Sequence, residues 1–188
     1  MGRTTPRPAM TIEGPIPWSS DKVAQLGIVG REAIAMSHEG ECSCGSIRFE
    51  LTAEPMIVHA CHCTRCQRAT GSAFVINAVV EKAAVALLSG APRAAHFEGT
   101  RHTAYFCDDC GTYVWSEYAG GFGACWFVRV GTLDDPGSCP PDVHIFTSTK
   151  QAWLVLPEGV PRFDEFYDLN SVWPQAALDR LRAAAPTG

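Results

Sequence analysis

The stretch Cys61-His62-Cys63-Thr64-Arg65-Cys66-Gln67-Arg68-Ala69-Thr70-Gly71 holds three cysteines within six residues, in the pattern Cys-x-Cys-x-x-Cys. Thiols this close together cannot form disulfides with one another without strain, but they converge readily on one metal ion. Three protein ligands leave the fourth position of a tetrahedral zinc open, and an open position is typical of a catalytic site. The stretch therefore predicts a zinc site at Cys61, Cys63 and Cys66 that can accept a substrate.

Two further cysteine pairs flank this triplet, Cys42-Ser43-Cys44 and Cys107-Asp108-Asp109-Cys110. Residues i and i+2 of an extended segment face the same side, and a Cys-x-x-Cys turn followed by Gly111, which tolerates positive φ, also aims two sulfurs at one point. We therefore expect a closed four-cysteine zinc from the two pairs, which ties the first strand to a distant turn. In the competing partition, the triplet takes a fourth ligand from His59, His62 or a cysteine of one pair, and the second site is left incomplete.

The composition limits which classes of protein this chain can belong to. The nine cysteines are an odd number at short spacings, and no secretory signal precedes them, which favours metal ligation in a reducing compartment over a disulfide framework. Hydrophobic residues make up 46% of the chain and charged residues 19%, a globular composition. The net charge of −5 disfavours nucleic acid as a partner. No apolar run approaches the ~18 residues of a membrane span, so we expect a cytoplasmic protein without a membrane segment.

Hydrophobic periodicity predicts a mainly β fold, an antiparallel arrangement of short strands. The zinc expected at the cysteine pairs would cross-link these strands. Ile47, Phe49 and Leu51 alternate with polar residues, which is the period of a half-buried strand. Further short apolar runs between turn residues predict strands at 56–60, 72–80, 85–88, 94–97, 103–106, 113–117, 124–130, 144–148 and 153–156. Only the C-terminal end is expected to be helical, in a short segment that Pro174 opens and that runs to Ala185.

The same features divide the chain into three parts. Residues 1–35 are rich in Pro, Gly and Thr and are expected to form a flexible N-terminal extension. Residues 36–170 are expected to form the zinc-binding β domain, and residues 171–188 the C-terminal helix and tail. The sequence is compatible with a homo-oligomer and does not specify one.

The ordered motifs resemble the glutathione-dependent formaldehyde-activating enzyme family, whose domain is shared with centromere protein V. The resemblance runs from Glu39 to Phe166 and rests on Gly40-Glu41-Cys42-Ser43-Cys44-Gly45, Ile47-Arg48-Phe49, the central stretch 61–71, Phe106 to Gly111, Val143-His144-Ile145-Phe146 and Trp153. It implies a β-tent fold with a structural zinc on the two outer pairs and a catalytic zinc on the triplet. It also implies a reaction that joins glutathione and formaldehyde to S-hydroxymethylglutathione, classed in reverse as carbon-sulfur lysis.

Zinc chemistry explains why such a reaction needs these residue types. Coordination ionises a thiol whose pKa is otherwise about 8.5, so a substrate thiol would enter the fourth position as a thiolate nucleophile. Four thiolates give the site a net negative charge, and glutathione adds carboxylates. Arg65 and Arg68, in the same loop, are the candidate substrate-binding cations; the alternative makes them solvated loop residues. For His62 we expect surface placement or a hydrogen bond behind the ligands, and for His144 a core or edge position.

The leading hypothesis is a zinc-dependent carbon-sulfur lyase-type enzyme with two zincs per chain. It would join a small-molecule thiol, glutathione first, to a formaldehyde-like aldehyde, or cleave the adduct, with Cys61, Cys63 and Cys66 as catalytic residues. The alternative is a non-catalytic zinc module that mediates protein or chromatin interaction, as the relationship to centromere protein V allows. The acidic balance weighs against nucleic acid. A third and weaker alternative is a thiol-disulfide redox protein.

Overall fold

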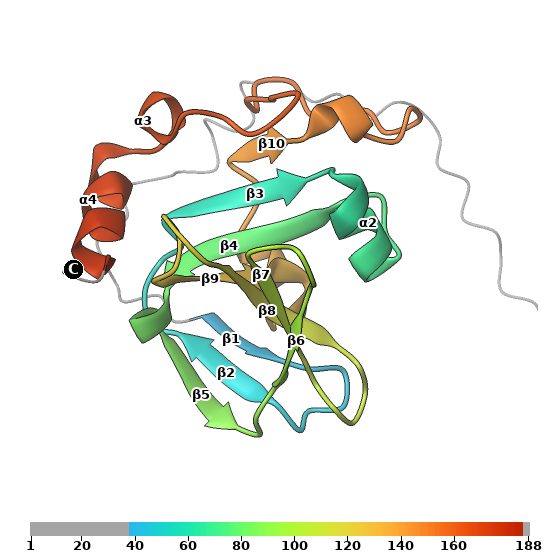
Figure 1. Ribbon diagram of the computed structural model, residues 1–188, viewed down its shortest axis with the longest axis vertical. Helices are drawn as coiled ribbons and strands as arrows, with labels where there is room; N and C mark the ends of the chain where they lie inside the picture. The colour runs from blue at the N-terminus through green and yellow to red at the C-terminus, as the bar shows by residue number, and fades with distance from the viewer. Residues whose placement is uncertain (1–37, 186–188) are drawn as a thin grey trace, which may run out of the picture. The chain divides into compact units, whose positions relative to one another are not determined.

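The computed structural model describes residues 38–185, in which ten short strands form two sheets. Strands β1 (His38–Glu41), β2 (Arg48–Leu51) and β5 (Val85–Ser89) make a three-stranded sheet in the order β1-β2-β5. The larger sheet has the order β10-β3-β4-β9-β8-β7-β6. Its strands are β3 (Ile57–Cys61), β4 (Val75–Glu81), β6 (Arg93–His96), β7 (His102–Phe106), β8 (Tyr113–Tyr118), β9 (Cys125–Arg129) and β10 (Val143–Ile145). The prediction of a mainly β fold is confirmed (Figure 1).

Neighbouring strands pair antiparallel throughout both sheets, except that β10 runs parallel to β3. The strand expected at 144–148 ends early, because Phe146 adopts a left-handed φ of 56° and the 3₁₀ turn η4 (Thr147–Thr149) follows. The strand expected at 153–156 is wrong. Trp153 and Val155 are 71% and 88% exposed there, and the segment joins neither sheet. An apolar run that pairs with neither sheet and leaves its side chains exposed is not a strand.

The two faces of the larger sheet carry separate hydrophobic clusters, because successive residues of a strand point to opposite faces. Val58 of β3 belongs to the cluster that contains Phe49 and Leu51 of the smaller sheet. This first cluster fills the space between the two sheets. Ile57 and Cys61 of the same strand belong to the second cluster, with residues of the C-terminal segment. The second face is therefore the one that carries the cysteine triplet.

The C-terminal segment contributes two short helices to this second face. α3 (Leu169–Val172) precedes α4 (Gln175–Ala184), and α4 is the predicted C-terminal helix. Buried Ala177 and Leu178 hold α4 against the sheet, and Arg180 forms an ion pair with Glu81 of β4 at 2.6 Å. Helix α2 (Thr64–Thr70) lies between β3 and β4, and three further 3₁₀ turns complete the elements, η1 (Lys82–Ala84), η2 (Val130–Thr132) and η3 (Pro136–Ser138). None of the helices described is long and apolar enough to cross a bilayer.

The division into three parts stays a prediction. The extension expected at 1–35 lies outside the described residues. The boundary expected between residues 170 and 171 falls inside α3.

Gly40 of β1 lies in a tightly packed place and provides a test of the contact between β1 and η2. A Cβ added there would lie 2.6 Å from the carbonyl oxygen of Thr132 and 2.6 Å from Cζ of Phe49. Gly40→Ala must therefore displace the η2 backbone or the buried Phe49 ring, and we expect it to lower the free energy of unfolding by about 1–3 kcal/mol. Urea unfolding of both variants checks this, with Gly131→Ala, where a Cβ meets nothing within 4 Å, as the matched control. Equal stability of the two variants would contradict the packing described.

Candidate metal and substrate site

The outer cysteines Cys42, Cys44, Cys107 and Cys110 form one group whose sulfur atoms all lie within 4.8 Å of one another. The Sγ atoms of Cys42 and Cys44 are 3.5 Å apart, and those of Cys44 and Cys107 are 3.8 Å apart. Tetrahedral zinc, with Zn–S bonds of ~2.3 Å, separates its sulfurs by about 3.8 Å, so these distances fit one shared ion. The first pair follows β1 and the second lies between β7 and β8. A metal here would therefore join the smaller sheet to the larger one.

Glycines shape the turns that carry these pairs, and the first turn favours ionised sulfur at Cys42. Gly45 and Gly111 have φ of 75° and 73°, the left-handed region that glycine enters without strain. The backbone N–H of Ile47 donates a hydrogen bond to Sγ of Cys42 at 3.3 Å. Burial opposes ionisation of Cys42, but this bond and the contacts with Ser46 and Cys44 lower its pKa to about 5. A thiolate is the form of cysteine that ligates a metal.

The central cysteines form a second group, again with all sulfur atoms within 4.8 Å of one another. Cys61 ends β3, Cys63 is the N-cap of helix α2 (Thr64–Thr70), and buried Cys66 lies in its first turn. Hydrogen bonds from Cys61 and then Cys66 lower the pKa of Cys63. Within the described part of the chain, neither His59 nor His62 joins the group. The geometry thus matches a division into four and three cysteines, rather than a triplet completed by a histidine.

Helix α2 was not expected, because the residues after Cys63 were interpreted as a loop. Helix starts are usually marked by Ser, Thr, Asp or Asn, whereas here Sγ of Cys63 accepts the hydrogen bond of the Cys66 amide at 3.4 Å. Gly71, with φ of 62°, ends the helix, and this terminator was visible in the sequence. Arg65 and Arg68 therefore lie on a helix, and the helix fixes the directions in which their side chains leave the backbone.

A cavity of about 490 Å³ lies beside the triplet. Its floor is the second face of the larger sheet, where the strand register aligns His59 of β3, Asn77 of β4 and Arg129 of β9 in one row. His59 and Asn77 line the cavity directly. Its remaining walls are largely aromatic and include Phe122, Phe127, Phe146 and Phe166. Three cysteines therefore face a half-open, mostly apolar space, which is the usual character of a small-molecule site.

The two arginines predicted to bind substrate lie differently with respect to this cavity. Arg65 lines it, whereas Arg68 does not. Both line a neighbouring hollow of about 580 Å³, together with Phe97 and Phe106. Both side chains are exposed. Contact with a substrate stays a prediction for each, and the geometry places Arg65 nearer to the cysteines' own cavity.

His62 and His144 pack behind the triplet. His62 is fully buried, so the surface placement weighed for it is wrong. Its Nε2 lies 2.9 Å from Nδ1 of His144, and its carbonyl oxygen accepts hydrogen bonds from Gln67 Nε2 at 2.6 Å and Thr149 Oγ1 at 3.0 Å. Burial lowers the pKa of His62 to about 4, so its ring is neutral. These contacts fasten the segment that holds Cys61 and Cys63 to β10 and η4.

Arg129 is a candidate that the sequence did not single out. It is only 5% exposed, donates hydrogen bonds to Asn77 Oδ1 and to Ser116 Oγ, the latter at 3.5 Å, and lies 3.8 Å from the ring centroid of Tyr113. Among residues 38–185, no carboxylate forms an ion pair with it. The pKa of the Cys66 thiol is lowered by its contact with Cys61, raised by more than this by Cys63 and burial together, and lowered to a smaller extent by the charge of Arg129. A buried cation without a carboxylate is costly, and the thiolates of the triplet are the negative charges that would offset this cost.

Replacing Arg129 with Gln should weaken metal binding at the triplet, because the thiolates lose a buried positive charge while the shape of the site is largely kept. We expect about a tenfold lower affinity, the effect of ~1.4 kcal/mol. Competition with a chromophoric chelator measures it. The four-cysteine group is the internal control and should keep its affinity, and Arg129→Lys should recover most of the loss at the triplet. An equal loss in both variants would contradict a role for the charge.

Comparison with known proteins identifies the family of this chain. The family model described as glutathione-dependent formaldehyde-activating enzyme matches residues 37–149. A Penicillium rubens protein, provisionally given the same name, is 32% identical over 114 residues, which are 57% of this chain and 59% of that protein. A crystal structure of a Rhodobacter sphaeroides protein is 20% identical with a TM-score of 0.42, over 55% of this chain and 94% of that chain. Because the family model covers more than half of its length, the chain belongs to the glutathione-dependent formaldehyde-activating enzyme family.

Proposed function

We propose that this protein is a zinc-dependent enzyme of the carbon-sulfur lyase type, which joins a thiol to an aldehyde or cleaves the adduct. The observation that carries the proposal is a group of three cysteines that faces a cavity, with no fourth ligand among the described residues. Family membership supports glutathione as the thiol and formaldehyde as the aldehyde. The matched relative is longer than the shared segment, so the activity is proposed for this chain and not transferred from that protein.

Zinc is the metal that best fits the two groups. Both offer cysteine sulfur alone, and soft thiolate ligands in a tetrahedral set select zinc or iron-sulfur clusters. The four-cysteine group would be complete and structural, whereas bound zinc at the triplet would ionise an incoming thiol and hold its sulfur. Thiolate ligands need a reducing compartment, and we place the protein in the cytoplasm.

The chain's own residues would supply the rest of the chemistry. Cys61, Cys63 and Cys66 provide the ligands, Arg129 offsets negative charge from beneath, and Arg65 faces the cavity where a substrate carboxylate would lie. The aromatic walls make the cavity largely apolar, which disfavours water that would compete with the thiol for the aldehyde. A sulfur-carbon bond then forms as the carbonyl π electrons move to oxygen.

Native mass spectrometry during titration with glutathione tests the proposal. We expect two zincs per chain and one thiol adduct. Cys63→Ala should lose one zinc, the adduct and the activity and keep its far-UV circular dichroism, because only the triplet would offer an open position. Cys107→Ala is the matched control and should lose the other zinc and much of the thermal stability. A protein that holds two zincs and forms no adduct would instead be the non-catalytic zinc module.

The two arginines on α2 can be separated by kinetics. Arg65→Ala should raise KM for glutathione about tenfold, because it removes a charge-assisted contact from the cavity. Arg68→Ala removes the same charge from the same helix but outside this cavity, and we expect a smaller rise. With 2-mercaptoethanol, which carries no carboxylate, neither variant should change KM by more than about twofold. An unchanged KM for glutathione in both variants would refute the cationic contact.

A further inference from the structure

His59 occupies the cavity wall next to Cys61. Residues 59 and 61 of β3 point to the same face of the sheet, because side chains alternate along a strand. The imidazole is 1% exposed and borders the cavity. It meets the rings of Phe166 and Tyr167 edge to face, with centroids 5.9 and 5.7 Å away. This packing fixes the plane of the ring.

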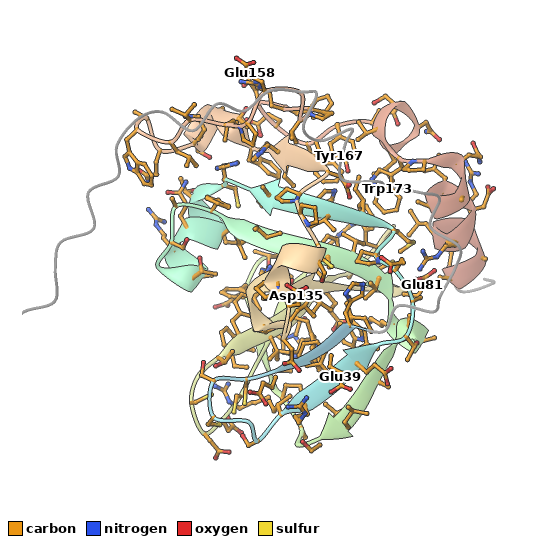
Figure 2. All side chains as sticks on the ribbon, turned by 180° about the vertical axis from the view of Figure 1, so that it is seen from behind. Glu39, Glu81, Asp135, Glu158, Tyr167 and Trp173 are labelled. Atoms are coloured by element: carbon orange, nitrogen blue, oxygen red, sulfur yellow. The ribbon has the colours of Figure 1, made fainter. Side chains whose placement is uncertain are left out.

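Two buried side chains determine which nitrogen of His59 carries the proton. Nε1 of Trp173 can only donate, and it lies 2.7 Å from the hydroxyl oxygen of Tyr167. The same oxygen lies 2.6 Å from Nε2 of His59. Because the oxygen accepts from Trp173, its single proton is available to His59, and Nε2 is the acceptor. Figure 2 labels Tyr167 and Trp173, which lie close together in the C-terminal segment.

The opposite assignment leaves a buried donor without a partner. If Nε2 carried the proton and donated it, the Tyr167 hydroxyl would accept twice and its own proton would have no acceptor among the described residues. An unsatisfied buried donor costs about 1–3 kcal/mol. The network therefore favours the neutral tautomer with hydrogen on Nδ1. Nδ1 makes no hydrogen bond to a described residue and is not one of the buried unpaired atoms, so a ligand in the cavity can reach it.

We infer that His59 is a catalytic residue that donates a hydrogen bond from Nδ1 to the aldehyde oxygen, with Tyr167 and Trp173 as positioning residues. The inference rests on the proposed function. When the thiolate sulfur attacks the carbonyl carbon, an S–C bond forms and the C=O π electrons become a lone pair on oxygen. A fixed N–H aimed at that oxygen stabilises the developing charge without reorganising.

The proton balance does not require His59 to give up its hydrogen. The incoming thiol releases one proton to water on ionisation, and the oxygen of the adduct takes one proton from water. In the cleavage direction the same two transfers run in reverse. His59 stays neutral in both directions, since the loss of Nδ1–H would leave an imidazolate.

Tyr118 is the phenolic hydroxyl among the described residues that line the cavity, and it is a weaker candidate. Its ring stacks on His102 at 4.6 Å, but no hydrogen bond to a described residue directs its hydroxyl proton. A donor that rotates freely must be ordered in each cycle, whereas the Nδ1–H of His59 is held in place before substrate arrives.

Nitrogen-15 NMR of the zinc-loaded protein tests the tautomer independently of activity. We expect Nδ1 of His59 in the protonated range and Nε2 in the unprotonated range, and a mixture of tautomers in Tyr167→Phe. Tyr105→Phe, which loses a hydroxyl bonded to Glu117 at 2.8 Å outside the cavity, is the matched control and should leave the His59 signals unchanged. A proton on Nε2 in the wild-type protein would overturn the inference.

Kinetics test the catalytic role. His59→Phe keeps the ring and should lower kcat about 100-fold, the usual cost of one lost oxyanion donor, while KM for the thiol and the thiol adduct in native mass spectrometry are retained. His59→Asn places an amide N–H near the position of Nδ1 and should recover about tenfold of that loss. A kcat that is unchanged in His59→Phe, or equal in the two variants, overturns the role. Failure of the wild-type protein to form the adduct would refute the proposed function instead, and the NMR result would still decide the tautomer.

Discussion

The convergence of cysteine sulfurs is the constraint on which the described structure depends. Cys44 and Cys107 are 63 positions apart in the sequence, yet their sulfur atoms are 3.8 Å apart. One lies in the smaller sheet's first turn and the other between two strands of the larger sheet. Closing so long a loop costs conformational entropy, and a metal ion shared by four thiolates would offset that cost directly. The first hydrophobic cluster, around Phe49, then fills the space that this junction defines.

Strand alternation lets one sheet support both a core and a site. Val58 and Ala78 face the first cluster, whereas His59 and Asn77, their neighbours in sequence, face the cavity. The rigidity of a doubly packed sheet therefore holds the cavity floor. Polar residues on that floor are buried, and each is fixed by a partner, Asn77 by Arg129 and His59 by Tyr167. A site assembled in this way is organised before any substrate arrives.

Residue spacing was sufficient to predict some features and not others. The two cysteine groups and the glycine turn at Gly111 were predictable because i, i+2 and i, i+3 relations determine local convergence. Helix α2 was missed because a sulfur replaces the usual oxygen at its N-cap. The sequence could not reveal the role of Arg129 or the contact between His59 and Tyr167. His59 and Tyr167 are 108 positions apart and meet only through tertiary packing. Periodicity identified most strands, and it failed at 153–156, where the apolar Trp153 and Val155 are exposed and the segment joins neither sheet.

The parallel pairing of β10 with β3 brings the chain back across the cysteine triplet late in the sequence. The family match ends at residue 149, so the seven cysteines of the two groups lie inside the shared segment, while Phe166 of the cavity wall and the buried Tyr167 and Trp173 come from beyond it. The two cysteine groups are thus encoded in one stretch of the polypeptide, whereas one part of the cavity wall and the contacts that orient His59 come from a later one. Substitutions in the C-terminal segment can therefore change one wall of the cavity and the orientation of His59 without replacing any of the seven cysteines.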